Sequence, residues 1–99
     1  MAEGVHGDEV RPVITASDAT LKGGEGHIHW ITISNNHATV PAEIELQDGS
    51  VDGWGVEVGD NALVGYPVHI VFDPPIHCDN DIRVDMTNAT DCQVTVGIS

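Results

Sequence analysis

This sequence contains six histidines, whose side chains are chemically versatile. His27 and His29 are two positions apart in a segment that favours a β-strand, so both imidazoles would lie on one face and could bind one metal ion. A third ligand from His69 or His77, or from another subunit, would complete such a site. Histidines on a wet face or at a subunit contact account for the same pattern, and we expect neither a metal nor another cofactor.

The acidic and nucleophilic residues form no catalytic pattern. Asp79 and Asp81 flank Asn80 like the start of a calcium-binding loop, but the glycine and the distant glutamate of an EF-hand are missing. A turn capped by its own side chains is the simpler interpretation. No serine lies in a Gly-x-Ser-x-Gly elbow, and the sequence contains no phosphate loop. We therefore predict that the protein is not an enzyme.

The two cysteines, Cys78 and Cys92, are predicted to be free. If Cys78 continued the strand that begins near Ile82, it would lie roughly 26 Å from Cys92 along a hairpin. A disulfide needs Cα atoms within about 7 Å of each other, so only a sharp turn at residues 79–81 would allow one. Buried thiols are the simpler expectation, because cysteine is among the most buried residue types.

Net charge limits the partners of this chain. It contains three basic and sixteen acidic residues, which give a formal charge of -13. Such a chain repels phosphate backbones and anionic lipids, so we expect neither nucleic acid nor a membrane as a partner. No apolar run approaches the ~20 residues of a membrane span. Residues 1–9 lack the pattern of a secretory signal, which predicts a protein made in the cytoplasm.

The clearest strand pattern lies in the last quarter of the sequence. Apolar residues alternate with polar ones over residues 82–87 and again over residues 92–98, with a turn between them. Pairing Val84 with Val94 in a hairpin would place every apolar side chain on one face. We therefore predict a C-terminal hairpin with one buried and one exposed face.

Other short segments share this strand-like character: residues 11–16, 28–34, 39–47, 53–58 and 68–72. Pro12 confines the first strand to a sheet edge, and Asp73-Pro74-Pro75 is expected to end the last of them, because proline cannot donate to a ladder. Residues 28–34 are apolar on both parities, which predicts a central strand or a bulge. No window has a helical period. We predict an all-β protein with one antiparallel β-sandwich or jelly-roll-like domain at residues 13–99, after an N-terminal arm at residues 1–12.

Three segments of the second half follow one another as strand, strand, turn and strand: residues 67–76, 82–87 and 91–96. In the first half, residues 29–35 precede a strand at residues 44–49 that closes on Asp48-Gly49. This order of strands and turns, over residues 28–99, resembles that of the small β-sandwich proteins that decorate, or cement, the capsids of tailed bacteriophages.

The resemblance implies a structural protein of the virion, made in the host cytoplasm and located on the capsid surface. It would form a homo-trimer through residues 28–34 and 67–72, bind the major capsid protein at the junctions between capsomers, and grip the capsid with its arm. The residues expected at these contacts are Val5, Val10, Arg11, Pro12, Trp30 and Trp54.

A carbohydrate- or receptor-binding module of a phage fibre or tail is the alternative function. Trp54 lies between Gly53 and Gly55, so its indole could be an exposed platform for a sugar ring, with Tyr66 in the same surface. A tryptophan in the core or at a subunit contact fits the same pattern. A third alternative is a histidine-bound metal in a sandwich with a small enzymatic role.

Overall fold

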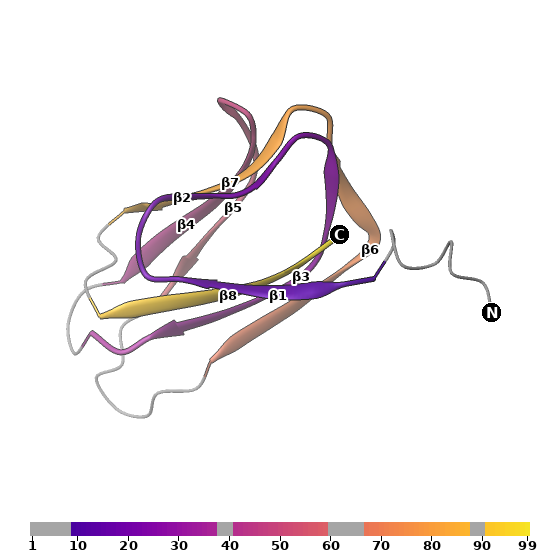
Figure 1. Ribbon diagram of the computed structural model, residues 1–99. Helices are drawn as coiled ribbons and strands as arrows, with labels where there is room; N and C mark the ends of the chain where they lie inside the picture. The colour runs from indigo at the N-terminus through magenta and orange to yellow at the C-terminus, as the bar shows by residue number, and fades with distance from the viewer. Residues whose placement is uncertain (1–8, 38–40, 60–66, 88–90) are drawn as a thin grey trace.

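The computed structural model describes residues 9–37, 41–59, 67–87 and 91–99. These residues form eight strands (Figure 1). Their bounds are β1 Arg11–Thr15, β2 Ala19–Gly23, β3 Gly26–Asn35, β4 Ala42–Asp48, β5 Val51–Val58, β6 Val68–Cys78, β7 Asp81–Thr87 and β8 Cys92–Ile98. Within the four described ranges, no helix is long and apolar enough to cross a membrane.

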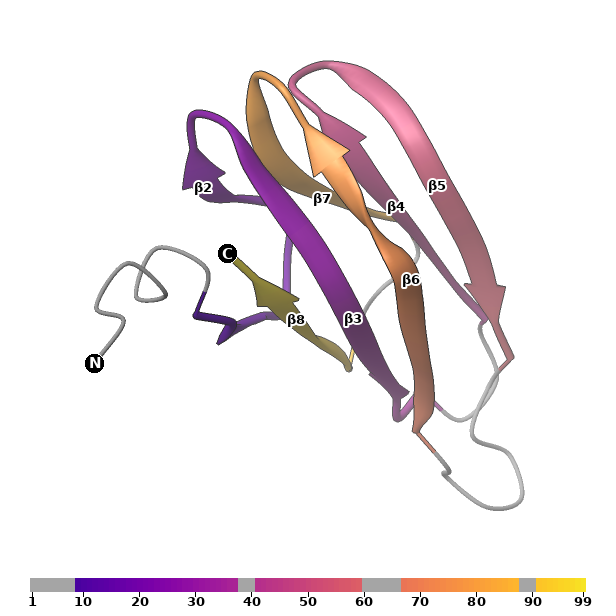
Figure 2. The same cartoon turned by 90° about the vertical axis from the view of Figure 1, so that its right-hand side faces the viewer.

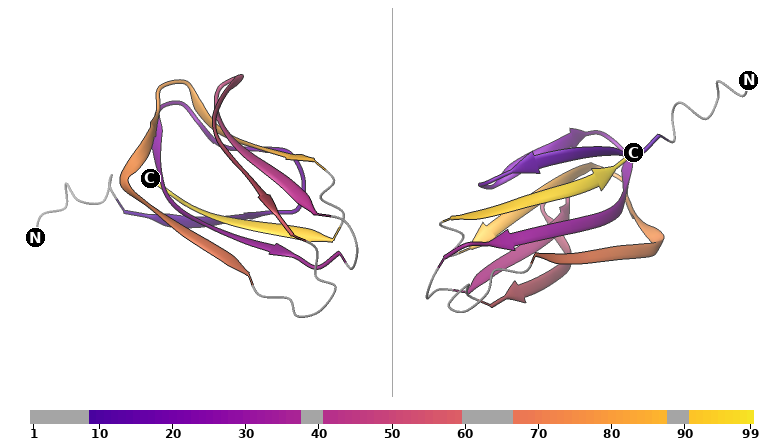
Figure 3. Two further views of the ribbon diagram at one scale, coloured as in Figure 1. Left: turned by 180° about the vertical axis from the view of Figure 1, so that it is seen from behind. Right: turned by 90° about the horizontal axis from the view of Figure 1, so that it is seen from below.

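The strands form two four-stranded antiparallel sheets that lie as two layers (Figures 1 and 3). Sheet A has the order β1-β8-β3-β6, and sheet B has the order β2-β7-β4-β5. The prediction of an all-β sandwich is therefore confirmed. β1 is an edge strand of sheet A, as Pro12 required, and β3 is a central strand, as its apolar residues on both parities indicated.

The strand pairs are nested along the chain. β1 pairs with β8, β2 with β7, β3 with β6, and β4 with β5, so the chain forms one long ribbon that is folded back at the β4–β5 turn. Rolling this ribbon brings β8 beside β3 and β7 beside β4, which closes the two sheets (Figure 2). Gly49, in the turn itself, has a φ of 63°, a conformation that glycine adopts without strain.

The core lies between the sheets and consists mainly of aliphatic side chains from alternate strand positions. In the two central strands of sheet A, Ile31, Ile33, Val94 and Val96 are fully buried, and Ile44 of β4 is fully buried opposite them. Removing a side chain of this size from water stabilises a fold by about 1.5–3 kcal/mol. The two-residue period of the sequence therefore identifies the inward faces correctly.

The predicted C-terminal hairpin is wrong in its pairing, although both of its strands exist. β7 belongs to sheet B and β8 to sheet A. Val84 lies opposite Leu46, and Val94 lies opposite Ile33, while all four side chains are buried. Two strands that each bury one face can share a sheet or can face each other across a core, and the alternation of apolar residues is the same in both cases.

Two further expectations for strands are corrected. β2 was not predicted, since Leu21 is its one large apolar residue. β6 does not end at Asp73-Pro74-Pro75 but continues to Cys78, with a cis peptide bond between Asp73 and Pro74. Residues 72–75 of β6 lie opposite His29 of β3 in a bulge. β6 tolerates the prolines because it is an edge strand, where one side of the backbone needs no partner.

The N-terminal arm was expected to include residues 1–12. β1 begins at Arg11, and both Arg11 and Pro12 have partners in β8. β1 therefore begins two residues before the expected start of the sandwich at residue 13. Residues 1–8, and with them the expected contact residue Val5, lie outside the described residues.

Candidate functional site

The outer face of sheet A carries two rows of residues that cross all four strands. The first row follows the strand register through Pro12, Gly97, Trp30 and Val71. The second row follows it through Ile14, Thr95, Thr32 and His69. We call these eight residues the neutral face. None of them is Asp, Glu, Lys or Arg, in a chain whose formal charge is -13.

Trp30 lies at the centre of the neutral face. A Cβ atom added to Gly97 would lie 2.2 Å from its Nε1 atom, so the indole occupies the space that a side chain at position 97 would need. The ring of His69 is 5.7 Å away between centroids, and Nδ1 of His69 forms a 2.6 Å hydrogen bond with Oγ1 of Thr32. The indole is therefore partly buried on an outward surface, where it is positioned by glycine and histidine.

Two aliphatic side chains are exposed at the edges of the neutral face. Ile14 of β1 is 61% exposed, and Val71 of β6 is 65% exposed. Isolated apolar residues are common on protein surfaces, but these two flank Trp30 on one sheet face without a charged side chain between them in either row. Burying such a surface requires no desolvation of an ionised group, which makes it suited to contact with another protein.

The outer face of sheet B is chemically different. Glu43, Glu45, Glu57 and Asp85 occupy four of its outward strand positions, and we call these four residues the acidic face. Arg83, which lies opposite Gln47, is on the same surface. Glu43 lies directly opposite Glu57, and Glu45 lies directly opposite Asp85. Like charges in such cross-strand positions repel each other, so this face favours contact with water and ions.

In the described part of the chain, His27 and His29 are not gathered with His69 or His77 into a group of three metal-ligating side chains. Nε2 of His29 is 2.8 Å from Oγ of Ser99, and its ring centroid is 6.3 Å from that of His27. His27 stacks instead on its cross-strand partner His77, with 4.8 Å between ring centroids and 18° between planes. His69 lies elsewhere, on the neutral face.

The other expected site residues lie apart from one another. Trp54 is partly buried against the core and makes an edge-to-face contact with Phe72, 5.2 Å between centroids, which favours packing over an exposed sugar platform. Val10 and Arg11 are exposed at the start of β1. Tyr66 lies outside the described residues. Of the expected contacts, Pro12 and Trp30 are the two that the strand register brings into one row.

Both cysteines are free and buried, as predicted. Burial raises the pKa of Cys78, with the Asp48 carboxylate adding to the effect, and burial alone raises the pKa of Cys92. These thiols are therefore kept protonated, as in a packed core. In the turn that resembled the start of a calcium-binding loop, Asp81 forms an ion pair with Arg83 at 3.2 Å, whereas Asp79 lies 3.6 Å from Nε2 of His77.

Sequence reasoning did not identify Ile14, Val71 or Thr95 as surface residues of one patch. The available signal was the absence of acidic residues at eight strand positions, 12, 14, 30, 32, 69, 71, 95 and 97, in a strongly acidic chain, but the strand order is needed to bring those positions together. Comparison of the chain with protein-family models, with curated proteins and with solved structures finds no match.

Proposed function

We propose that the protein is a capsid decoration protein of a tailed bacteriophage, which assembles through the neutral face and stabilises the junctions between capsomers without catalysing a reaction. The observation that carries this proposal is the neutral face itself. It offers Trp30 and two exposed aliphatic residues on one sheet surface, in a chain that is otherwise rich in carboxylates. A surface of this composition is typical of the centre of a protein contact.

The strand order supports the same proposal. Eight strands in two sheets, paired in a nested ribbon, have the arrangement expected of a jelly roll, an architecture that virus capsid proteins use. Architecture alone does not specify function, so this support is secondary to the neutral face.

In the proposed assembly, the neutral face forms the contacts of a homo-trimer. It contains Trp30 and Thr32 from residues 28–34, and His69 and Val71 from residues 67–72. The acidic face points to solvent, and the N-terminal arm contacts the major capsid protein. Several arms in one trimer raise the effective affinity, because each bound arm holds the others close to the capsid surface.

Deletion of residues 1–10 tests the proposed role of the arm. The deletion leaves all eight strands intact, because β1 begins at Arg11 and pairs with β8 from that residue onward. We expect the truncated protein to keep the oligomeric mass and thermal stability of the full chain but to lose binding to purified phage heads from which the protein has been stripped. Cosedimentation with the heads measures the binding.

Two outcomes would contradict the proposal. If the full chain does not cosediment with stripped heads, the protein is not a decoration protein. If the truncated chain coats heads as completely as the full chain, the arm does not provide the capsid contact, and a surface of the sandwich does.

A further inference from the structure

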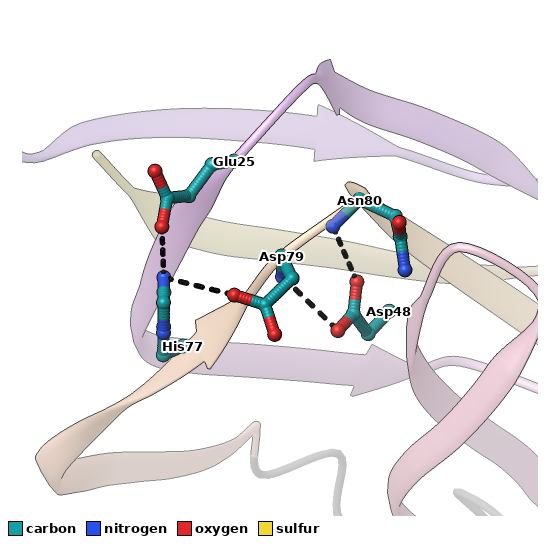
Figure 4. A network of polar contacts seen from close by, with 5 residues as sticks. All are labelled: Glu25, Asp48, His77, Asp79 and Asn80. Atoms are coloured by element: carbon teal, nitrogen blue, oxygen red, sulfur yellow. Dashed lines mark hydrogen bonds and ion pairs between the residues drawn. The ribbon is translucent and has the colours of Figure 1, made fainter.

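Two turns and the end of a strand meet at one end of the sandwich, away from the centre of the neutral face, and they bring metal-ligating side chains together. Glu25 lies in the turn between β2 and β3, His77 near the end of β6, and Asp79 in the turn between β6 and β7 (Figure 4). One ligand atom from each lies within 4.8 Å of the other two. We propose that Glu25, His77 and Asp79 form a binding site for a divalent transition-metal ion of the Zn²⁺ class.

The distances fit a site that a metal ion can enter by small side-chain rotations. Nε2 of His77 is 2.6 Å from Oε2 of Glu25 and 3.6 Å from Oδ1 of Asp79. Ligand atoms in a tetrahedral zinc site with bonds near 2.1 Å are about 3.4 Å apart. All three side chains are exposed, so they can adjust without disturbing the core.

The ligand set determines the class of metal. One imidazole nitrogen and two carboxylate oxygens suit Zn²⁺ and similar first-row ions, whereas Ca²⁺ prefers six to eight oxygen ligands. A metal ion would replace the hydrogen bond between His77 and Glu25, since Nε2 binds metal through the lone pair of the neutral ring. The ring proton would then lie on Nδ1.

Two neighbouring residues hold the ligands in place. The Asp48 carboxylate accepts hydrogen bonds from the backbone N–H groups of Asp79, at 3.0 Å, and Asn80, at 2.8 Å, which positions the Asp79 turn (Figure 4). The exposed His27 ring stacks on His77 from the adjacent strand. Water can fill the remaining coordination position.

Titration of the untagged full chain with ZnCl₂ tests the site, by calorimetry and by ¹H–¹⁵N NMR spectra. We expect one Zn²⁺ to bind, with the amide signals of residues near Glu25, His77 and Asp79 moving first. His77→Ala and Glu25→Gln should each weaken binding by about tenfold or more, which corresponds to at least 1.4 kcal/mol. Both side chains are exposed, so the thermal stability of the metal-free variants should match that of the parent chain.

His69→Ala is the matched control, because His69 is also an exposed histidine of β6 but lies on the neutral face. Its affinity for Zn²⁺ should equal that of the parent chain, and Ca²⁺ should bind much more weakly than Zn²⁺. The proposal is wrong if the parent chain does not bind Zn²⁺, if His77→Ala binds as tightly as the parent, or if His69→Ala weakens binding as much as His77→Ala does.

Discussion

The two sheets share one apolar core but present opposite surfaces to solvent. On sheet A, a row from Pro12 to Val71 crosses four strands without an ionisable side chain, whereas on sheet B two pairs of carboxylates lie directly opposite each other. The net charge of -13 is therefore distributed unevenly between the two faces. Covering the neutral face costs little desolvation, whereas covering the acidic face requires ionised groups to leave water.

The largest expected effect follows from placing a carboxylate on the neutral face. In the proposed trimer, Val71→Glu brings like charges together at a buried contact, which costs several kcal/mol. Self-association should become more than about a hundredfold weaker, and sedimentation equilibrium should show monomers. Val51→Glu is the control, since Val51 of β5 in sheet B is 65% exposed, the same as Val71. If the two variants have equal masses, self-association does not depend on the neutral face.

A second experiment compares glycines on the two faces. Gly97→Ala places a methyl group where the Trp30 indole lies, whereas Gly55→Ala on sheet B meets its nearest atom at 3.4 Å, an ordinary contact. We expect Gly97→Ala to lower the free energy of unfolding by about 1–3 kcal/mol in urea titrations. Gly55→Ala should have a much smaller effect. In the Trp30→Ala background the cost of Gly97→Ala should largely disappear, and an unchanged cost would show that the indole is not its cause.

Charge reversal on the acidic face should stabilise the protein. Glu57→Lys converts the pair of Glu43 and Glu57 into opposite charges and should raise the free energy of unfolding by roughly 0.2–1 kcal/mol at low salt. The gain should shrink in high salt, because screening weakens surface charges. Gln93→Lys is the control, since Gln93 is exposed, lies outside the neutral face and has Ser34 as its cross-strand neighbour in β3. A similar gain for both variants would mean that net charge, rather than the pairing, is responsible.

The smallest effect concerns a carboxylate that stabilises the fold. Hydrogen bonds from the backbone N–H groups of Asp79 and Asn80 lower the pKa of Asp48 from its ordinary value of 3.8. The stabilisation by ionised Asp48 is therefore present above that pH and is lost as the pH falls through the lower pKa of the folded state. Asp48→Ala should be less stable than the parent at neutral pH, and the difference should narrow in acid, as followed by urea unfolding with a chelator present. A difference that does not change with pH would contradict this account.

The alternation of apolar residues allowed the sequence to predict which strand faces are buried, but not how strands pair. Val84 and Val94 point into the core in either arrangement. The local sequence pattern therefore cannot distinguish a hairpin from two strands in facing sheets. β2 was missed because Leu21 gives it too little apolar signal, and β6 was cut short because the tolerance of Pro74 and Pro75 depends on its position at an edge.

A residue of the candidate sites could be predicted from the sequence only where the evidence came from that residue alone, without its cross-strand neighbours. Trp30 was among the expected contact residues, and the strand register places it in the first row of the neutral face, while its contact with another protein stays a prediction. Val71 lies opposite Trp30, and His77 lies opposite His27. The register between β3 and β6 brings each pair together, although its two residues are some 40 to 50 positions apart in the sequence. The bulge at His29 also shifts the parity of β3, and no residue type in that segment predicts where the shift occurs.

The nested strand order also determines when the protein can fold during its synthesis. β8 is made after the other seven strands, yet it lies between β1 and β3 and supplies Val94 and Val96 to the core. Until β8 leaves the ribosome, β1 has no partner in sheet A and one edge of β3 is unpaired. The nascent chain therefore exposes aggregation-prone strand edges until β8 emerges, and the sandwich is completed only after translation of that strand.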